Sequence, residues 1–293
     1  MILIFLAILF SASLVISFKL FVKLKVNTFH AILVNYFVAA FTSYLFAEKN
    51  FEINPSDNWF KFASGMGLLF ILTFVATSIT AQKISVITSM IASKMSLIIP
   101  LTYAVIFVGE QMTLLKFTAI VLAMIGVVLT VIQPKNNELK SRNMKSILLI
   151  AAVFAGSGLV DTSFKYIENN FYATGVPPQW VMMVCYASAA VLGTLYWILQ
   201  SLRIKPHISY RSVIAGILLG VLNYFSFIFV VESLHNPLLP STVVFPLINV
   251  GVLLLATFIA IILFHERLRT INYIGVILSI LSILVLAMQN YVI

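Results

Sequence analysis

The sequence predicts an all-α integral membrane protein in which ten transmembrane helices form two inverted-topology repeats of five helices. Three observations lead to this fold: the composition, a series of ten apolar segments, and an internal repeat. Of the 293 residues, 61% are hydrophobic and 9% are charged, and the mean hydropathy is +1.09. A soluble domain is about half apolar and about a quarter charged, so a bilayer has to solvate most of this chain.

Each predicted helix is about 20 mostly apolar residues long, which is the length needed to cross a hydrocarbon core about 30 Å thick. Backbone groups inside a bilayer must be bonded within the chain, so helices are expected. The first segment lacks the positive start of a signal peptide, and we expect it to be retained. The loops are too short to form a soluble domain. The segments are 2–22, 29–47, 62–81, 86–108, 115–132, 145–166, 180–200, 212–232, 240–264 and 271–289.

Basic side chains concentrate in alternate loops. The loops after the even-numbered segments hold three lysines, at 49, 61 and 116, whereas the loops after the odd-numbered segments hold twelve basic residues. Cytoplasmic loops carry the positive excess, so both termini are expected outside a cell (cytoplasmic) membrane. The net charge of +9 then reflects topology and anionic headgroups, and no nucleic acid partner is expected. The twelve are Lys23, Lys25, Lys83, Lys135, Lys140, Arg142, Lys145, Arg203, Lys205, Arg211, Arg267 and Arg269.

The two halves of the chain share several features in the same order. The tripeptide Ser-Phe-Lys at 17–19 recurs at 163–165, and Glu110 recurs as Glu266. At the offset that relates the two glutamates, small residues recur on one helix face, where they let helices approach closely. These residues are Ala119, Ala123 and Gly126 in the first half and Gly275, Ser279 and Ser282 in the second.

This repeat predicts a first half at 1–133, a cytoplasmic linker at 134–144 and a second half at 145–293. Because five is an odd number, the second half enters the membrane in the opposite sense to the first. Inverted repeats of this kind recur in secondary transporters, where the substrate binds near the bilayer midplane between the repeats.

With these features the sequence resembles the EamA-type branch of the drug/metabolite transporter (DMT) superfamily. Gly109-Glu110 follows the fourth segment and precedes the small-residue segment from Ala119 to Gly126. The second half has His265-Glu266 at the corresponding place, so the glycine is lost there. The resemblance covers nearly the whole chain. It implies a central cavity, alternating access, and export of small polar metabolites, without specifying one substrate.

Lys94 is the strongest candidate for a substrate-binding residue, because a charge at membrane depth usually faces a cavity or a partner. It lies about eight residues from the start of its segment and is flanked by Ser93 and Ser96. A lysine there is able to bind a carboxylate or a phosphate. The alternatives are a side chain that reaches toward the interface or a buried ion pair with Asp161.

Asp161 and Lys165 lie four residues apart in the sixth segment, so they share a helix face and predict a local ion pair. The alternative for Asp161 is a carboxylate that couples transport to protons. Lys19 and Lys165 lie near segment ends and are expected to reach the interface.

Other polar residues lie deep in apolar segments, where they either line the cavity or hydrogen-bond between helices. Asn249 corresponds to Ser93 in the repeat, which favours a pseudosymmetric cavity. Tyr103 is expected either to line that cavity or to pack. The remaining candidates for substrate binding are Asn35, Asn223 and Tyr224.

Two prolines, Pro100 and Pro246, fall inside the fourth and ninth segments. Proline removes a helix hydrogen bond and kinks the helix, so both are candidate hinges. Glu110 and Glu266 each precede a segment, where a carboxylate complements the helix dipole.

The sequence therefore predicts a secondary transporter of small polar, carboxylate-bearing and amino-acid-like solutes, acting as a monomer. No catalytic cluster, metal-ligand spacing or phosphate-binding loop is present, so we expect no enzyme, metal, cofactor or ATP. The lone Cys185 permits no internal disulfide. The alternatives are an exporter of organic cations or drugs, and a non-transporting membrane-embedded subunit or enzyme.

Overall fold

A computed structural model describes residues 2–107, 113–131, 144–202, 209–234, 241–265 and 269–288. Within these residues the chain forms α-helices and one short 3-10 helix, and it forms no strand. The helices are α1 (Ile2–Lys23), α2 (Thr28–Phe46), α3 (Asn58–Lys83), α4 (Val86–Met95), α5 (Ile98–Phe107), α6 (Leu114–Val131), α7 (Met144–Asn170), η1 (Tyr172–Thr174), α8 (Pro178–Ser201), α9 (Tyr210–Leu234), α10 (Ser241–Phe264) and α11 (Thr270–Met288).

Each predicted apolar segment coincides with helical structure, and only the fourth is divided, into α4 and α5. By length and composition, 6 helices are long and apolar enough to cross a membrane, namely α1, α2, α3, α7, α8 and α9. Shorter apolar helical stretches cover 86–100, 251–264 and 270–282. The chain is therefore a multi-pass membrane protein, as predicted.

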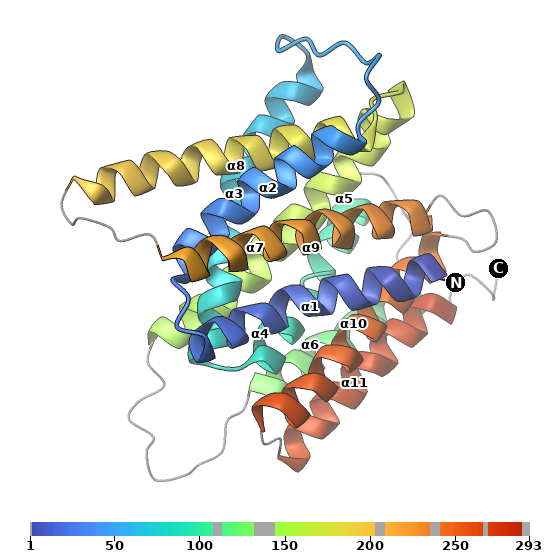
Figure 1. Ribbon diagram of the computed structural model, residues 1–293. Coiled ribbons are helices and arrows are strands. Elements are labelled where there is room, and N and C mark those ends of the chain that lie inside the picture. The colour runs from blue at the N-terminus through green and yellow to red at the C-terminus, as the bar shows by residue number, and fades with distance from the viewer. Residues whose placement is uncertain are drawn as a thin grey trace.

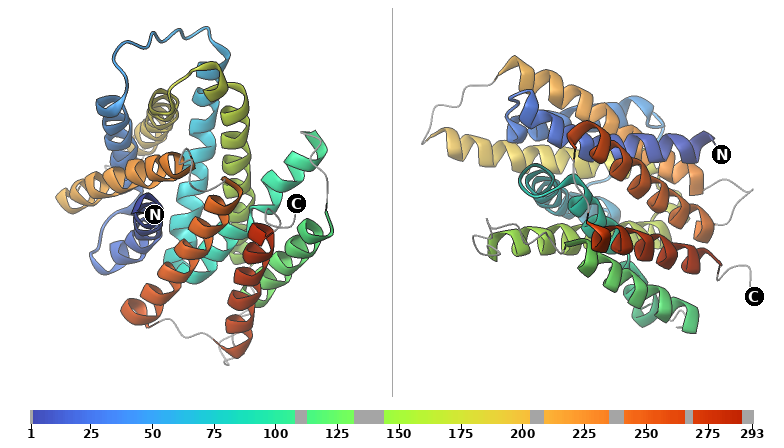
Figure 2. Two further views of the ribbon diagram at one scale, coloured as in Figure 1. Left: turned by 90° about the vertical axis from the view of Figure 1, so that its right-hand side faces the viewer. Right: turned by 90° about the horizontal axis from the view of Figure 1, so that it is seen from below.

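The helices form one bundle in which segments far apart in the sequence lie side by side (Figure 1). Helix α2 packs against α8 and α9, and α1 packs against α9 and α10. Helix α3 contacts α7 and α8, while α4 contacts α7 and α10. Helices α6 and α11 pair along one side of the bundle, which the end-on view shows clearly (Figure 2).

The interior of the bundle is closely packed, and its outer faces are apolar. Phe18, Tyr36 and Tyr186 are among the largest fully buried side chains. Phe41 and Phe258 are each more than half exposed. Burying such surface is favourable, so exposed aromatic rings of this kind are expected to face lipid.

Small residues set the closest helix contacts. Gly216 and Gly220 of α9 lie against the backbone oxygens of Ala31 and Asn35 in α2, with no room for a Cβ. The Gly-x-x-x-Gly pair thus serves packing within the chain. Gly126 of α6 meets α11 in the same way. Its neighbours there are Gly275 and Ser279, so the two predicted small-residue faces pack against each other.

The fourth segment breaks at Ser96 and Leu97, and Pro100 explains the break. A proline inside a helix has no N–H to donate and its ring clashes with the carbonyl four residues earlier, which here belongs to Ser96. The backbone turns instead, with Ile99 N donating to Ser96 O at 2.9 Å. The predicted segment 86–108 thus consists of two helices, and the break lies one turn before the predicted kink at Pro100. Helix α10 continues through position 246, where the side chain lies outside the described residues.

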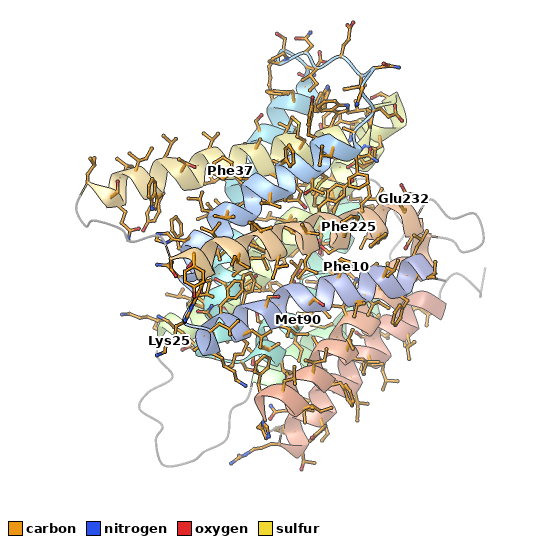
Figure 3. The ribbon with its side chains drawn as sticks, viewed as in Figure 1. Phe10, Lys25, Phe37, Met90, Phe225 and Glu232 are labelled. Carbon is orange, nitrogen blue, oxygen red and sulfur yellow. The ribbon has the colours of Figure 1, made fainter. Side chains whose placement is uncertain are left out.

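Basic residues gather at one end of the bundle. Lys25 and Glu232 mark the two ends (Figure 3). The start of α1 and the end of α11 both lie at the end away from Lys25 (Figure 1). The other described basic residues at the Lys25 end are Lys23, Lys83, Lys145, Arg211 and Arg269.

Candidate functional site

The candidate site lies where α4 meets α7 in the middle of the bundle. Ser157 of α7 donates a hydrogen bond to Ser93 Oγ of α4 at 3.0 Å. Beside it, Gly158 has no side chain and lies against Ile99 at the start of α5. Glycine at 158 lets α7 approach the break between α4 and α5, because a Cβ there would clash with Ile99.

Lys94 and Asp161 lie next to this contact in the chain. Lys94 directly follows Ser93, and Asp161 lies one helical turn beyond Ser157. Their described side chains form no salt bridge, because no nitrogen–oxygen distance between them is 4.0 Å or less. Binding of a solute by Lys94, its reach toward the interface and its ion pair with Asp161 all stay predictions.

The helix break places backbone acceptors beside Lys94. This residue lies in the last turn of α4, where carbonyl groups have no partner within the helix. Ser96 Oγ donates to Ser93 O at 2.5 Å, which satisfies one of them. The negative end of the helix dipole lies here as well, beside the hydroxyl groups of Ser93 and Ser96.

A second polar cluster joins α2, α8 and α9. Asn223 Nδ2 lies 3.1 Å from Asn35 Oδ1, and Tyr186 OH donates to Asn223 Oδ1 at 3.4 Å. With the Asn35 amide in its other orientation, its nitrogen donates to Leu219 O and its oxygen accepts from Tyr36 N, and the amide still lies beside that of Asn223. Asn35 is fully buried. The arrangement is that of a hydrogen-bond network between helices.

The other predicted residues lie elsewhere. Tyr224 stacks on Phe46 at a centroid distance of 5.5 Å. Tyr103 stacks on Phe107 within α5. Asn249 is buried on α10, the helix that packs against α4, and none of the described residues is its hydrogen-bond partner.

An aromatic layer lies between the two polar clusters. Phe164 of α7, three residues beyond Asp161, contacts Phe227 at 4.8 Å and Phe70 at 5.8 Å between ring centroids. Phe70 in turn contacts Tyr186 at 5.7 Å. Aromatic rings here give the region between the charged and amide groups an apolar wall with negative ring faces.

Several of these residues could not be singled out from the sequence. Ser157, Phe70 and Tyr186 have nothing in their local sequence that marks them, because serine and aromatic residues are common in apolar helices. One signal existed for Phe164, which belongs to the repeated Ser-Phe-Lys tripeptide. Its counterpart Phe18 contacts Phe74 of α3 at 5.0 Å, so the two phenylalanines have similar surroundings.

Among the described residues, no group of three His, Cys, Asp or Glu side chains could hold a metal ion. Cys185 is buried and unbonded. The polar groups described above are thus suited to noncovalent binding.

Comparison with known proteins finds a transporter family in the N-terminal part of the chain. The sequence model of the EamA-like transporter family matches residues 1–132, and that family lies within the DMT superfamily. The N-terminal part of this chain is therefore similar to transporters of the DMT type.

Two further similarities extend over nearly the whole chain. An uncharacterized protein of Haemophilus influenzae is 29% identical over 284 residues, which cover 94% of each chain. A protein of known crystal structure matches 97% of this chain and 94% of its own, with a TM-score of 0.63 and 15% identity. That structural likeness shows that the fold is shared.

Proposed function

We propose that this protein is a secondary transporter that exports small polar, carboxylate-bearing solutes by alternating access. The family that matches residues 1–132 is one of transporters. The observation that carries the proposal is Lys94, a cation in the middle of the bundle that directly follows Ser93, whose hydroxyl accepts from Ser157. A cation at membrane depth is costly unless a partner offsets it, and a solute carboxylate is such a partner.

The packing of the helices supports ten spans in two inverted halves. In such a repeat, the first-half units α1, α2, α3, α4 with α5, and α6 correspond in this order to α7, α8, α9, α10 and α11. Each contact between a helix of one half and a helix of the other then has a counterpart. The pair α1–α9 corresponds to α7–α3, the pair α1–α10 to α7–α4, and the pair α2–α9 to α8–α3. The pairs α2–α8 and α6–α11 correspond to themselves. A pseudo-two-fold axis generates this pattern, and the family match ends at residue 132, beside the proposed boundary at 133.

Charge supports an orientation. Basic residues gather at the Lys25 end of the bundle, and cytoplasmic ends carry that excess. The start of α1 and the end of α11 lie at the opposite end (Figure 1). We therefore place both termini outside the cell membrane. Two corresponding halves in one chain form a complete bundle, which favours a monomer. Because the sequence has no phosphate-binding loop, we propose transport without ATP.

Ligand-induced thermal stabilisation tests this proposal. A ligand that binds only the folded protein raises the melting temperature by mass action. We expect amino acids and other carboxylates to stabilise the wild type and to have no effect on Lys94→Ala. The control is Lys61→Ala, which removes an exposed lysine at the start of α3 and should respond like the wild type. If carboxylates stabilise Lys94→Ala as well as the wild type, Lys94 is not the anion-binding group.

A second candidate is an exporter of organic cations. The Asp161 carboxylate lies on the same helix as Phe164, whose ring contacts Phe70 and Phe227. Aromatic faces and a carboxylate together attract a cation. Stabilisation by tetraethylammonium that is lost in Asp161→Asn and kept in Lys94→Ala would favour this candidate.

A further inference from the structure

Tyr36 carries a buried hydroxyl group for which the described part of the chain supplies no hydrogen bond. The residue lies near the middle of α2 and is 1% exposed. Its ring contacts Phe74 of α3 at 5.8 Å and Tyr186 of α8 at 6.2 Å between centroids. None of the described residues donates to its hydroxyl or accepts from it. An unbonded polar group in a protein interior costs free energy, so this hydroxyl calls for an explanation.

Tyr36 has a counterpart in the second half of the chain. Residues 34–40 read Val-Asn-Tyr-Phe-Val-Ala-Ala, and residues 184–190 read Val-Cys-Tyr-Ala-Ser-Ala-Ala. Valine, tyrosine and both alanines recur at the same spacing, which makes Tyr186 the counterpart of Tyr36. Helices α2 and α8 correspond to each other in the proposed repeat, and they pack together. The contact between the two tyrosine rings therefore joins equivalent positions, as a pseudo-two-fold axis between the halves requires.

The phenylalanines around the two tyrosines follow the same correspondence. Phe18 of α1 contacts Phe74 of α3 at 5.0 Å between ring centroids. Phe164 of α7 contacts Phe227 of α9 at 4.8 Å. Because Phe18 and Phe164 belong to the repeated Ser-Phe-Lys tripeptide, these two contacts are equivalent. Phe74 and Phe227 are therefore counterparts on α3 and α9.

One position breaks this symmetry. One helical turn before Phe227 lies Asn223, which accepts a hydrogen bond from the Tyr186 hydroxyl at 3.4 Å. On α3 the corresponding position holds Phe70, whose ring has no polar atom to offer Tyr36. The protein thus provides a partner for one tyrosine hydroxyl and an apolar ring at the equivalent place beside the other.

The apolar core links Tyr36 to the helix that carries Lys94. Tyr36 belongs to a cluster of contacting buried residues that includes Met90, Ile91 and Met95 of α4. Met95 directly follows Lys94 in the sequence. The free hydroxyl and the candidate cation therefore border one continuous core.

We propose that the hydroxyl of Tyr36 binds a neutral polar group of the transported solute, while Lys94 binds its carboxylate. The rings that contact Tyr36 are uncharged, so a second charge beside this hydroxyl would have nothing to offset it. A neutral hydroxyl group suits the place, because the tyrosine O–H both donates and accepts. The inference rests on the proposed function in giving the carboxylate to Lys94. It adds a second recognition point, which selects carboxylate-bearing solutes that also carry a hydroxyl.

Tyr36→Phe and Tyr186→Phe form a matched pair, because each removes one oxygen atom at equivalent positions. Without ligand, Tyr36→Phe should keep or raise the melting temperature, since removing a buried hydroxyl that has no bond removes its desolvation cost. Tyr186→Phe should lower it, since that hydroxyl bonds Asn223. If both variants lower the melting temperature equally, the Tyr36 hydroxyl is bonded within the protein and the inference is overturned.

Ligand-induced thermal stabilisation tests binding with two pairs of amino acids that differ in one hydroxyl. The pairs are L-threonine with L-valine and L-tyrosine with L-phenylalanine. In at least one pair, the hydroxylated member should bind the wild type roughly tenfold more tightly, which is the effect of one hydrogen bond. In Tyr36→Phe both members of that pair should bind equally, and Tyr186→Phe should keep the preference.

The inference and the proposed function fail in different ways. Equal binding within both pairs in the wild type, with all binding lost in Lys94→Ala, would overturn the inference and leave the proposed function standing. A hydroxyl preference that Tyr36→Phe removes, with carboxylate binding kept in Lys94→Ala, would support Tyr36 and contradict the role of Lys94. A preference that persists in Tyr36→Phe would overturn the inference, and so would a wild type that binds none of the four amino acids.

Discussion

At the scale of single residues, we expect Lys94 and Asp161 to form a charge pair at membrane depth, which is one of the alternatives that the sequence offers for Lys94. Leaving one of two buried charges without its partner costs about 3–5 kcal/mol, whereas replacing both by apolar residues is often neutral or stabilising. We therefore expect Asp161→Asn to lower the melting temperature clearly and Lys94→Met with Asp161→Leu to recover most of the loss. Thermal unfolding in detergent measures both.

The same comparison separates stability from function. The double apolar variant keeps the bundle but has no cation for a solute, so it should unfold like the wild type and transport nothing. If the double variant is as unstable as Asp161→Asn, the two residues are not coupled in the folded protein.

The hydroxyl of Tyr186 gives a second prediction at this scale. It donates to Asn223, and a hydrogen bond between membrane helices contributes about 0.6 kcal/mol on average. We expect Tyr186→Phe to lower the free energy of unfolding by about this amount. Tyr224→Phe is the matched control, since the Tyr224 ring stacks on Phe46 instead. Equal losses in both variants would contradict a specific role for Tyr186.

The sequence allowed some of these residues to be predicted and not others. Lys94 and Asp161 were predictable because charges are rare in apolar helices. Asn35 and Asn223 were predictable as buried amides, and they do meet. Ser157 was not, because its importance comes only from lying opposite Ser93, and which helices face each other is set by the tertiary packing.

At the scale of helices, apolar length alone located every segment, because hydrocarbon thickness fixes how long a span has to be. The division of the fourth segment was the exception. Pro100 predicted a kink and the structure has two separate helices, whereas α10 remains one helix through position 246. A membrane helix stays continuous through a proline only where neighbouring groups hydrogen-bond the backbone carbonyl that the proline leaves without a partner. The sequence alone does not reveal these neighbours.

The break between α4 and α5 leads to a prediction about transport. In Pro100→Ala the N–H that proline lacks is present, so the two helices can join. We expect transport into proteoliposomes to slow severalfold while the melting temperature stays the same or rises, because proline in a helix interior costs about 3 kcal/mol. Pro246→Ala, in the unbroken α10, should transport at nearly the wild-type rate. If Pro100→Ala transports normally, the break is not a hinge.

At the scale of the whole molecule, the charge distribution predicts the orientation in the membrane. Lys25 and Glu232 are exposed at opposite ends of the bundle (Figure 3), and the basic end is expected to face the cytoplasm. In a Cys185→Ala background, a membrane-impermeant maleimide should label Glu232→Cys in intact cells and should label Lys25→Cys only after the membrane is opened.

The same experiment tests the number of spans when a tag is added at each terminus. Ten spans put both termini on the side of Glu232, so both tags should be accessible in intact cells. Labelling of Lys25→Cys from outside would reverse the orientation and leave the inverted repeat intact. Termini on opposite sides would require an odd number of spans, and two matching halves of five helices could not then account for the fold. Whether the two tags lie on the same side of the membrane therefore decides between an even and an odd number of spans. Whether Glu232→Cys or Lys25→Cys is labelled from outside decides the orientation of the bundle.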